Sequence, residues 1–443
     1  MEAHGCQLGQ CEDHANQGLE FREKLFPVLQ DEYWHRVWTQ QEMLLASEIV
    51  VHCRGVCFKG NLWLNLQFII FNTYSGWLDL KSEIPDIMFE FHRKYPEYLI
   101  TKSLRNTLVG AKELLHNLFS HVYALKATDD RDKLYGILGL VDSIPESIVV
   151  NYSLSTAQVY SQLFNHIIEQ GKSLEFLCCV PNVDKSLPSW FPSLDKVEAA
   201  RWDLHSKQSA CSNIPAAAKI ISSGITLRVR GFQVDVVLRK SEDELVSNSA
   251  VKWLGEVREM SQEAFLTSGG SSGSADDAVA KLLFWWKSTA LYSQFPLLAS
   301  GHALADTEVE KRVAWTHLME ALDKDQGLNL INLAAAHPPA EIKKIIPFLR
   351  YSSQILQNQS FISTCDRGML GLASSRAKPG DGIWILFGCR APVILWPSGT
   401  HHTYISPARI ADVSEGQACV GLLGDGEPGL GYIGPLIRTI EIE

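Results

Sequence analysis

The 443-residue sequence lacks any apolar run long enough to cross a membrane. A spanning helix needs roughly 18 or more uninterrupted apolar residues, and no stretch reaches that length. The opening Met1-Glu2-Ala3-His4-Gly5-Cys6 carries an acid and no apolar segment, which is typical of neither a secretory signal nor a transit peptide. The ten cysteines are scattered rather than densely spaced, which is typical of reduced thiols rather than of a disulfide framework. These absences predict a cytoplasmic protein with reduced thiols and no membrane partner.

The sequence also lacks the signatures of common enzymes. It contains no Gly-x-Ser-x-Gly elbow, no His-Glu-x-x-His helix and no kinase signature set. The formal net charge is -10, and no basic run interrupts it, so nucleic acid is not an expected partner. His4, Cys6, Cys11 and His14 are zinc-competent residue types, but their spacing matches no established finger. We therefore expect no metal site and no bound cofactor.

What the sequence has is abundant apolar residues in patterns of two different periods. Hydrophobic residues make up 46% of the chain, which is ample for more than one packed core. Helical and alternating patterns together predict a mixed α/β (α+β) fold. Four parts are expected: a disordered tail at 1–18, a mixed module at 19–150, a mainly helical region at 151–357 with a flexible loop at 266–277, and a β-rich region at 358–443 that forms a small barrel or meander.

The most strongly predicted helix covers residues 155–171. Ser155 and Gln158 have the spacing of a capping box, in which each side chain bonds the other residue's backbone N–H. Apolar residues then recur on one helical face until Gly171. Alternating apolar residues at 221–237, and short apolar runs at 383–387 and 393–396, predict strands.

A second helix is indicated from residue 34, where Trp34, Trp38, Gln41 and Leu45 step by four, three and four. Tryptophans at this spacing can stack an aromatic base, but they more often belong to the core. Glu42 lies on the same side of this helix as Trp38, which predicts a partly desolvated carboxylate with a raised pKa. Two roles remain open for Glu42: a catalytic carboxylate, or an ion pair with Arg36 that orients the helix.

A third helix is predicted at 134–138, after a charged segment. Asp129 stands three residues before Asp132, so one carboxylate can cap the helix while the other favours its positive end. Arg131, Asp132 and Lys133 could bind a phosphate or an acidic surface of a partner. The alternative, which such charged first turns favour, is a structural role in capping and in solvated ion pairs.

Four sequence blocks follow one another along the chain. They lie at 33–42, at 127–140, at Leu187-Pro188-Ser189-Trp190-Phe191-Pro192, and at 361–395 with Gly380-Asp381, closed by Asp425-Gly426-Glu427. Taken together and in this order, they resemble the fungal heterokaryon-incompatibility (HET) domain family. The first is similar to the family's aromatic, Arg-x-Trp and Gln-Glu signature, and the second to its most recognisable block. The third looks like the Pro-Ser-Trp-x-Pro segment, and the fourth like the usual C-terminal region.

The resemblance implies a module similar to TIR domains, but one departure bears on it. The family normally carries a Leu-Ser-Tyr-x-Trp-Gly segment and an Asp-x-x-Cys-Ile-Asn-Gln segment, and neither is present here. The 19–150 region is therefore expected to be a partial HET domain, truncated at the front and without its sheet half. A degenerate gene, a start codon placed too late, and a partner that supplies the missing part remain open explanations.

By resemblance, the chain is expected to act in self/nonself recognition and programmed cell death through protein interaction. Its partner would be an allelic or non-allelic incompatibility factor, or a second copy in a homo-oligomer. An alternative is a TIR-like NAD glycohydrolase, with NAD as the substrate and Glu42 as the catalytic residue. A further alternative is an accessory protein of a fungal specialised-metabolite gene cluster. The motif residues expected to take part in binding are Arg36, Trp38, Gln41, Asp129, Arg131, Asp132 and Lys133.

Overall fold

The chain folds as two compact units, residues 1–144 and 145–443. The computed structural model describes residues 32–48, 50–53, 56–59, 125–141, 144–179, 181–182, 186–193, 208–221, 225–242, 250–267, 358–419 and 436–443, with positions 279, 282, 316 and 320. Within this part of the chain, no helix combines the length and the apolar character that crossing a bilayer requires.

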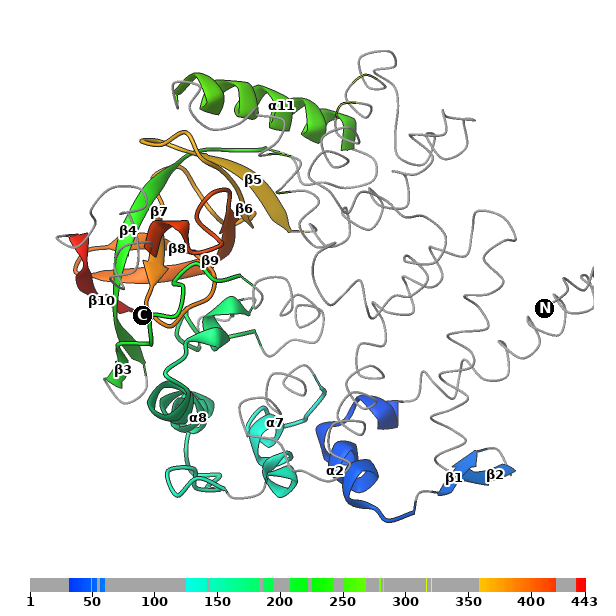
Figure 1. Ribbon diagram of the computed structural model, residues 1–443. Helices are drawn as coiled ribbons and strands as arrows, with labels where there is room; N and C mark the ends of the chain where they lie inside the picture. Colours follow the sequence, from blue (N-terminus) through cyan, green and yellow to red (C-terminus); the bar gives the residue numbers. More distant parts are fainter. Residues whose placement is uncertain are drawn as a thin grey trace, which may run out of the picture. The chain divides into compact units, whose positions relative to one another are not determined.

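The first unit contains short helices and a hairpin (Figure 1). Val37, Leu125, Leu134 and Ile137 are all fully buried and form its core. The hairpin is antiparallel, with Val50 opposite Lys59. The elements are η1 (Glu32–His35), α2 (Val37–Leu45), β1 (Val50–Cys53), β2 (Val56–Lys59), α7 (Asp132–Tyr135) and η2 (Leu138–Leu140).

The second unit begins with α8 (Thr156–Gly171) and η3 (Glu175–Cys178). The predicted capping box at Ser155 and Gln158 is confirmed, because each side chain bonds the other residue's backbone N–H, at 3.3 and 2.9 Å. One face of α8 is buried, and the Phe164 ring stacks on Phe176 with centroids 4.6 Å apart. Apolar burial on this face and the cap together explain why the helix was predictable.

Eight strands of the second unit belong to one sheet. They are β3 (Ala218–Ile221), β4 (Thr226–Lys240), β5 (Gln359–Thr364), β6 (Leu370–Ser374), β7 (Gly382–Leu386), β8 (Val393–Ser398), β9 (His401–Ile410) and β10 (Arg438–Ile442). The strand order is β10-β4-β5-β6-β9-β8-β7, with β3 paired to β4 and with further β4–β7 and β10–β9 pairings. Pairing therefore runs from β4 through β5, β6, β9, β8 and β7 back to β4.

The 15-residue strand β4 pairs with four neighbours along its length. Its first half lies between β3 and β10, and later residues pair with β7 and β5. The register shifts between Gln233 and Asp235 and again between Val237 and Arg239. Such bulges bend a strand and increase its twist, which lets one long strand change neighbours.

The inner side of this sheet is apolar, and one helix packs beside it. Phe232, Ile362, Ile383, Ile385 and Ile394 belong to a single buried cluster. Helix α11 (Ala250–Thr267) packs Trp253 edge-on against Phe361, with ring centroids 6.3 Å apart. A short helix, η6 (Gln417–Cys419), contributes two further buried residues to this unit.

The mixed α/β class predicted from the sequence is confirmed, because the structure contains both helices and a sheet. The strands expected at 221–237, 383–387 and 393–396 correspond to β4, β7 and β8. Helix α11 was not predicted. The β-rich region at 358–443 pairs with β4, which the sequence had placed in the mainly helical region. The disordered tail expected at 1–18 lies outside the described residues. The flexible loop expected at 266–277 starts later than predicted, because α11 continues to Thr267, and its other residues lie outside the described part of the chain. Helical apolar patterns also predict helices at 278–291, 308–322 and 341–356, and most of these residues are likewise outside that part.

Two glycines give opposite predictions for the same substitution. A Cβ on Gly371 would lie 2.5 Å from Ile410 Cδ1 and 2.8 Å from the Arg409 carbonyl, whereas one on Gly255 in α11 meets nothing within 4 Å. Gly371→Ala should destabilise the second unit by about 1–3 kcal/mol through overpacking. Gly255→Ala should stabilise it by about 1 kcal/mol through helix propensity. Urea unfolding midpoints measure both changes, and equal midpoints for the two variants would contradict the close packing of β6 on β9.

Candidate functional site

The first and second sequence blocks meet in the structure although about ninety residues separate them. Trp38 Nε1–H donates to Asp132 Oδ2 at 3.3 Å, across 94 positions of sequence. Gln41 Nε2–H donates to the Gly136 carbonyl at 2.6 Å, across 95 positions. Three of the predicted motif residues therefore join α2 to α7 directly.

The backbone fixes the start of α2 against the segment before α7. The Val37 N–H donates to the Lys126 carbonyl at 3.0 Å, within a parallel bridge between Arg36 and Lys126. Val37 is fully buried, and a Cβ on Gly136 would lie 3.2 Å from both of its methyl carbons. The glycine therefore allows the two segments to approach closely enough for the Gln41 hydrogen bond.

The charged segment of the second block is organised mainly by its own contacts. Arg131 donates to both carboxylate oxygens of Asp129, at 2.9 and 2.6 Å, in a side-on pair. This hydrogen-bonded guanidinium lowers the pKa of Asp129. Helix α7 begins at Asp132 rather than at 134, and Asp129 accepts the N–H of Arg131 at 3.0 Å, just before the first helical residue.

Lys133, in the same segment, is buried. Only 4% of its surface is exposed, which is unusual for a lysine. Asp132 is only partly exposed and accepts the Trp38 indole N–H. These contacts favour the structural alternative for Asp132 and Lys133, whereas binding roles for the motif residues stay predictions.

The predicted desolvation of Glu42 is wrong. Glu42 is exposed, and it shares a solvent-facing side of α2 with Trp38 and Leu45, which are 38% and 56% exposed. The helix buries Val37 and Thr39 instead, so the apolar spacing indicated a common face correctly but not which way that face points. No ion pair joins Glu42 to Arg36, two residues that the structure describes.

The partner of Glu42 is Tyr33. The Tyr33 hydroxyl donates to Glu42 Oε2 at 2.7 Å, and burial of the ring together with this carboxylate raises the pKa of Tyr33 to about 12. The phenol therefore stays a proton donor at neutral pH. An exposed carboxylate lies beside a tyrosine that is itself 40% exposed, and Trp38 is on the same side of the helix. This group can accept hydrogen bonds from a ligand and offer aromatic surface to it.

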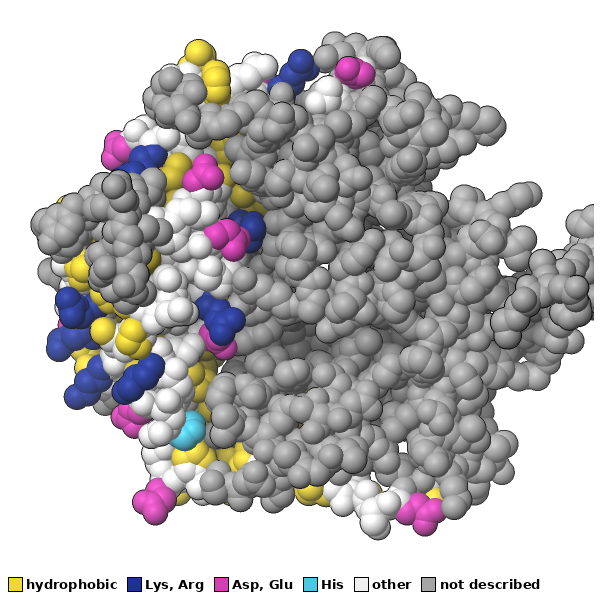
Figure 2. All heavy atoms as spheres, in the orientation of Figure 1, with side chains coloured by type: hydrophobic (Ala, Val, Ile, Leu, Met, Phe, Trp, Pro, Cys, Tyr) yellow, Lys and Arg dark blue, Asp and Glu magenta, His cyan; other side chains and the backbone are white. Residues whose placement is uncertain are grey.

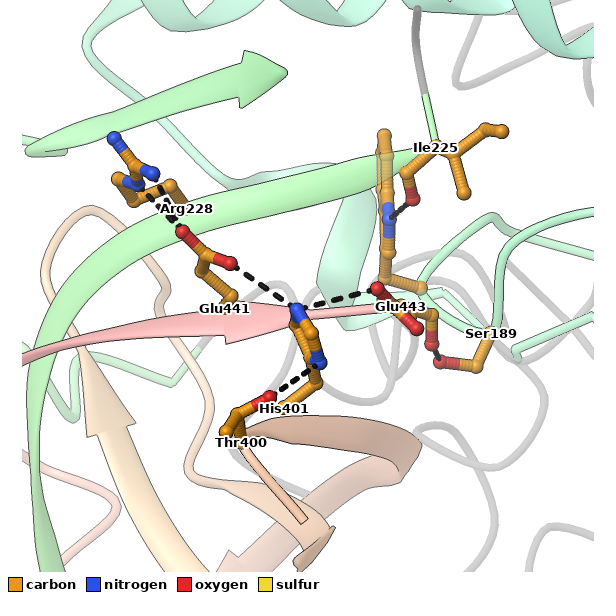
Figure 3. A network of polar contacts seen from close by, with 8 residues as sticks. Ser189, Ile225, Arg228, Thr400, His401, Glu441 and Glu443 are labelled. Carbon is orange, nitrogen blue, oxygen red and sulfur yellow. Dashed lines mark hydrogen bonds and ion pairs between the residues drawn. The ribbon is translucent and has the colours of Figure 1, made fainter. Parts of the chain in front are cut away.

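The third block secures the C-terminal strand of the second unit (Figure 3). Ser189 Oγ–H donates to the Glu443 carbonyl, and the same oxygen accepts the Tyr404 N–H at 2.8 Å. Next to it, the buried Trp190 donates its indole N–H to the Ile225 carbonyl at 2.9 Å, just before β4. Ser189 and Trp190 therefore connect β4, β9 and β10.

A row of charges crosses the outer side of the same strands. Arg228 on β4 pairs with Glu441 on β10 at 2.6 Å. His401 on β9 lies 3.3 Å from Glu441 and 3.3 Å from Glu443, and its other ring nitrogen contacts Thr400 Oγ1 at 3.0 Å (Figure 3). Sequence alone gave no signal for this network, because cross-strand register is what brings these residues together.

The fourth block builds a turn rather than a ligand loop. Gly380 has a φ of +95°, which favours glycine. Asp381 Oδ2 accepts the Lys378 N–H at 2.8 Å, and the Asp381 carbonyl accepts the Val237 N–H at 2.9 Å. Burial raises the pKa of the Asp381 carboxyl. The Gly-Asp pair therefore joins the start of β7 to β4. Among the described residues, no group of three or more His, Cys, Asp and Glu side chains is placed to hold a metal ion.

Comparison with known proteins yields limited similarity. No protein-family model matches the sequence, and no solved structure matches it. The chain is similar to heterokaryon incompatibility protein 6, OR allele, of Neurospora crassa, with 27% identity over 253 residues. The match is distant and partial. It covers 48% of this chain and 35% of that protein, so the chain spans well under two thirds of the relative's length.

The contact between α2 and α7 predicts a local effect of one substitution. Gln41→Ala removes the side-chain donor to the Gly136 carbonyl, and an unsatisfied, poorly solvated carbonyl costs about 1–3 kcal/mol. Amides of residues 132–140 should then exchange with deuterium roughly 5- to 100-fold faster, as measured by mass spectrometry. Leu45→Ala, at an exposed position of the same helix, is the control and should change exchange little. Equal exchange in both variants would mean that the hydrogen bond does not hold the segments together.

Proposed function

We propose that the chain is a heterokaryon-incompatibility protein that recognises other proteins and takes part in cell-death signalling in the fungal cytoplasm. Two observations support the proposal. The chain is similar to a Neurospora heterokaryon incompatibility protein over 48% of its length. The first and second blocks, which resemble the HET family, also contact each other through Trp38–Asp132 and Gln41–Gly136 hydrogen bonds. The second observation carries the proposal, because a shared module requires these blocks to pack together.

Protein contact is the favoured mode of action because of what α2 exposes. Tyr33, Trp38 and Leu45 are 40%, 38% and 56% exposed, although each has a large apolar side chain. Tyrosine and tryptophan are enriched at protein interfaces, where an apolar ring is covered and a polar atom stays bonded. Tyr33 and Trp38 already use their polar atoms within the unit, so a partner need only cover the rings. A TIR-like architecture of this module is part of the same proposal.

Expression in a fungus tests the proposal. Induced expression of the full chain in Neurospora crassa should slow hyphal growth and increase uptake of a vital dye in strains that carry an incompatible factor. Gln41→Ala should reduce this effect, because it weakens the α2–α7 contact. Gly255→Ala should retain it, because that substitution meets open space on α11 in the other unit.

The outcomes separate clearly when protein levels are matched by immunoblot. Harmless expression in every strain of a panel that covers the known incompatibility groups would contradict the proposed function. Full killing by Gln41→Ala at equal abundance would instead contradict the role of the α2–α7 contact.

A second candidate function is supported by the surroundings of Glu42. We propose as the alternative that Glu42 assists cleavage of the nicotinamide glycosidic bond of NAD. Its carboxylate is exposed and lies beside Tyr33 and Trp38, so it can reach a ribose hydroxyl while the rings contact a base. Water would add to the ribose carbon as nicotinamide leaves, giving ADP-ribose. The raised pKa of Tyr33 keeps its proton on the oxygen and its hydrogen bond on Glu42.

The enzymatic alternative makes a simple prediction. Purified full chain incubated with NAD should release nicotinamide, measured by liquid chromatography, and Glu42→Gln should lower the rate on the order of 10²–10⁴-fold. Glu48→Gln removes the same charge from the exposed segment just after α2 and is the matched control. Absence of nicotinamide at high protein concentration would remove this alternative and leave the recognition role intact.

A further inference from the structure

Buried cysteines of the second unit come together from separate parts of the sequence. Cys178 ends η3, Cys211 lies before β3, Cys389 follows β7 and Cys419 ends η6. These four residues are between 0% and 3% exposed, and each carries a free thiol. The contacts described above give these thiols no role, and no spacing in the sequence relates them, so the fold alone gathers them.

Two of these thiols lie on segments that are bonded to each other. The backbone N–H of Leu174, just before η3, donates at 2.8 Å to the carbonyl of the residue before Cys389. Glu175, the first residue of η3, forms an ion pair with Arg390 at 2.8 Å. Between these contacts, the thiol of Cys389 is hydrogen-bonded to that of Cys178. The two sulfur atoms are therefore neighbours although 210 residues separate them.

The other two thiols of the cluster bond backbone carbonyls instead. Cys211 Sγ–H donates to the Ser212 carbonyl at 3.5 Å, and Cys419 Sγ–H donates to the Ala210 carbonyl at 3.3 Å. A metal ion does not account for the cluster, because the described residues include no group of three or more His, Cys, Asp and Glu side chains that could hold one. The chemistry that remains is the reaction of the two mutually bonded thiols with each other.

We propose that hydrogen peroxide converts Cys178 and Cys389 into a disulfide, which covalently links η3 to the turn after β7. One thiol attacks a peroxide oxygen, which gives a sulfenic acid and one water. The second thiol then attacks the sulfenic sulfur, the S–S bond forms and a second water leaves. The two thiols thus supply the two electrons and two hydrogens that reduce one peroxide to two waters. The inference is independent of the proposed function.

Burial keeps this pair reduced until the two segments separate. The hydrogen bond from Cys178 and burial raise the pKa of the Cys389 thiol well above its ordinary value, so little thiolate forms in the closed fold. Both cysteines are fully buried, so an oxidant reaches them only when η3 moves away from the turn. The Glu175–Arg390 ion pair joins the same two segments at the surface, with side chains 29% and 54% exposed. Weakening this ion pair should therefore expose the thiols more often.

A second ion pair in this unit provides a matched control. Where Figure 1 draws the sheet, Figure 2 shows dark blue and magenta side chains next to one another on the surface. Arg239, at the end of β4, pairs with Glu263 of α11 at 3.0 Å. This pair joins α11 to the sheet and has no part in holding η3, so its loss should not expose the cysteines.

Peptide mapping of the full chain tests the proposal. The folded chain is treated with hydrogen peroxide, the remaining thiols are blocked with iodoacetamide in urea, and tryptic peptides are analysed by tandem mass spectrometry. The new bond should join peptides 173–185 and 377–390, and dithiothreitol should break it. Fragmentation distinguishes Cys178 from Cys179, which lies in the same peptide. The oxidised chain should also unfold roughly 5 °C higher than the reduced chain, because the bond closes a long loop in the unfolded state.

Two variants test how access to the pair is controlled. Glu175→Gln weakens the ion pair with Arg390 and should speed disulfide formation roughly two- to fivefold. Glu263→Gln makes the same change in the Arg239 pair and should leave the rate unchanged. Equal rates in the two variants would contradict the control of access by the Glu175–Arg390 pair.

The wild-type chain decides the main claim, so the result does not depend on whether a cysteine variant folds. The proposal fails if Cys178 and Cys389 are both recovered with iodoacetamide attached while Cys365, which is only partly buried, is oxidised. It fails if Cys178 is found bonded to Cys211 instead of Cys389. It also fails if the oxidised chain unfolds at the same temperature as the reduced chain or below it.

Discussion

Backbone pairing along β4 is the constraint on which the larger unit depends. This one strand pairs with β3, β10, β7 and β5, and two register shifts let it pass from one set of neighbours to the next. The surrounding contacts converge on it, since Trp190 bonds the carbonyl just before it and Asp381 joins β7 to its middle. The charged row is a further consequence, because only pairing with β4 brings Lys219 of β3 and Glu441 of β10 beside Arg228.

The motif residues act mainly by fixing how backbone segments approach one another. Gln41 and Trp190 each donate to a main-chain carbonyl, and Ser189 bonds both a carbonyl and an N–H. Gly136 and Gly371 allow approaches that a Cβ would prevent. Such side-chain to backbone bonds are worth about 1 kcal/mol each, but they specify one geometry, since a buried carbonyl without its donor is costly. Sequence blocks with this role resemble one another for reasons of folding as well as of function.

The sequence predicted best where a local signal and burial agreed. Ser155 and Gln158 cap α8 as expected, and the apolar runs after residue 380 became β7 and β8. The orientation of α2 could not be predicted, because its apolar residues lie on two sides and only packing of Val37 on Gly136 decides which is inward. The Tyr33–Glu42 bond was missed because a tyrosine nine residues away lies outside helical spacing. The pairing of β4 with distant strands depends on register, which no local pattern contains.

Exposed residues that the fold does not need are the positions at which binding specificity could vary while the fold stays the same. Specificity is a difference between binding free energies, so it changes when exposed side chains change on fixed supports. Lys219 and Arg230 are exposed on strands whose pairing does not involve their side chains, and Trp38 is 38% exposed while its N–H stays on Asp132. Substitution at such exposed positions can therefore alter a partner's affinity without disturbing the core. Substitution at Gln41, Gly136 or Trp190 removes contacts that hold backbone segments in place. Differences in partner choice are therefore expected at the exposed positions, and loss of folding is expected at these three.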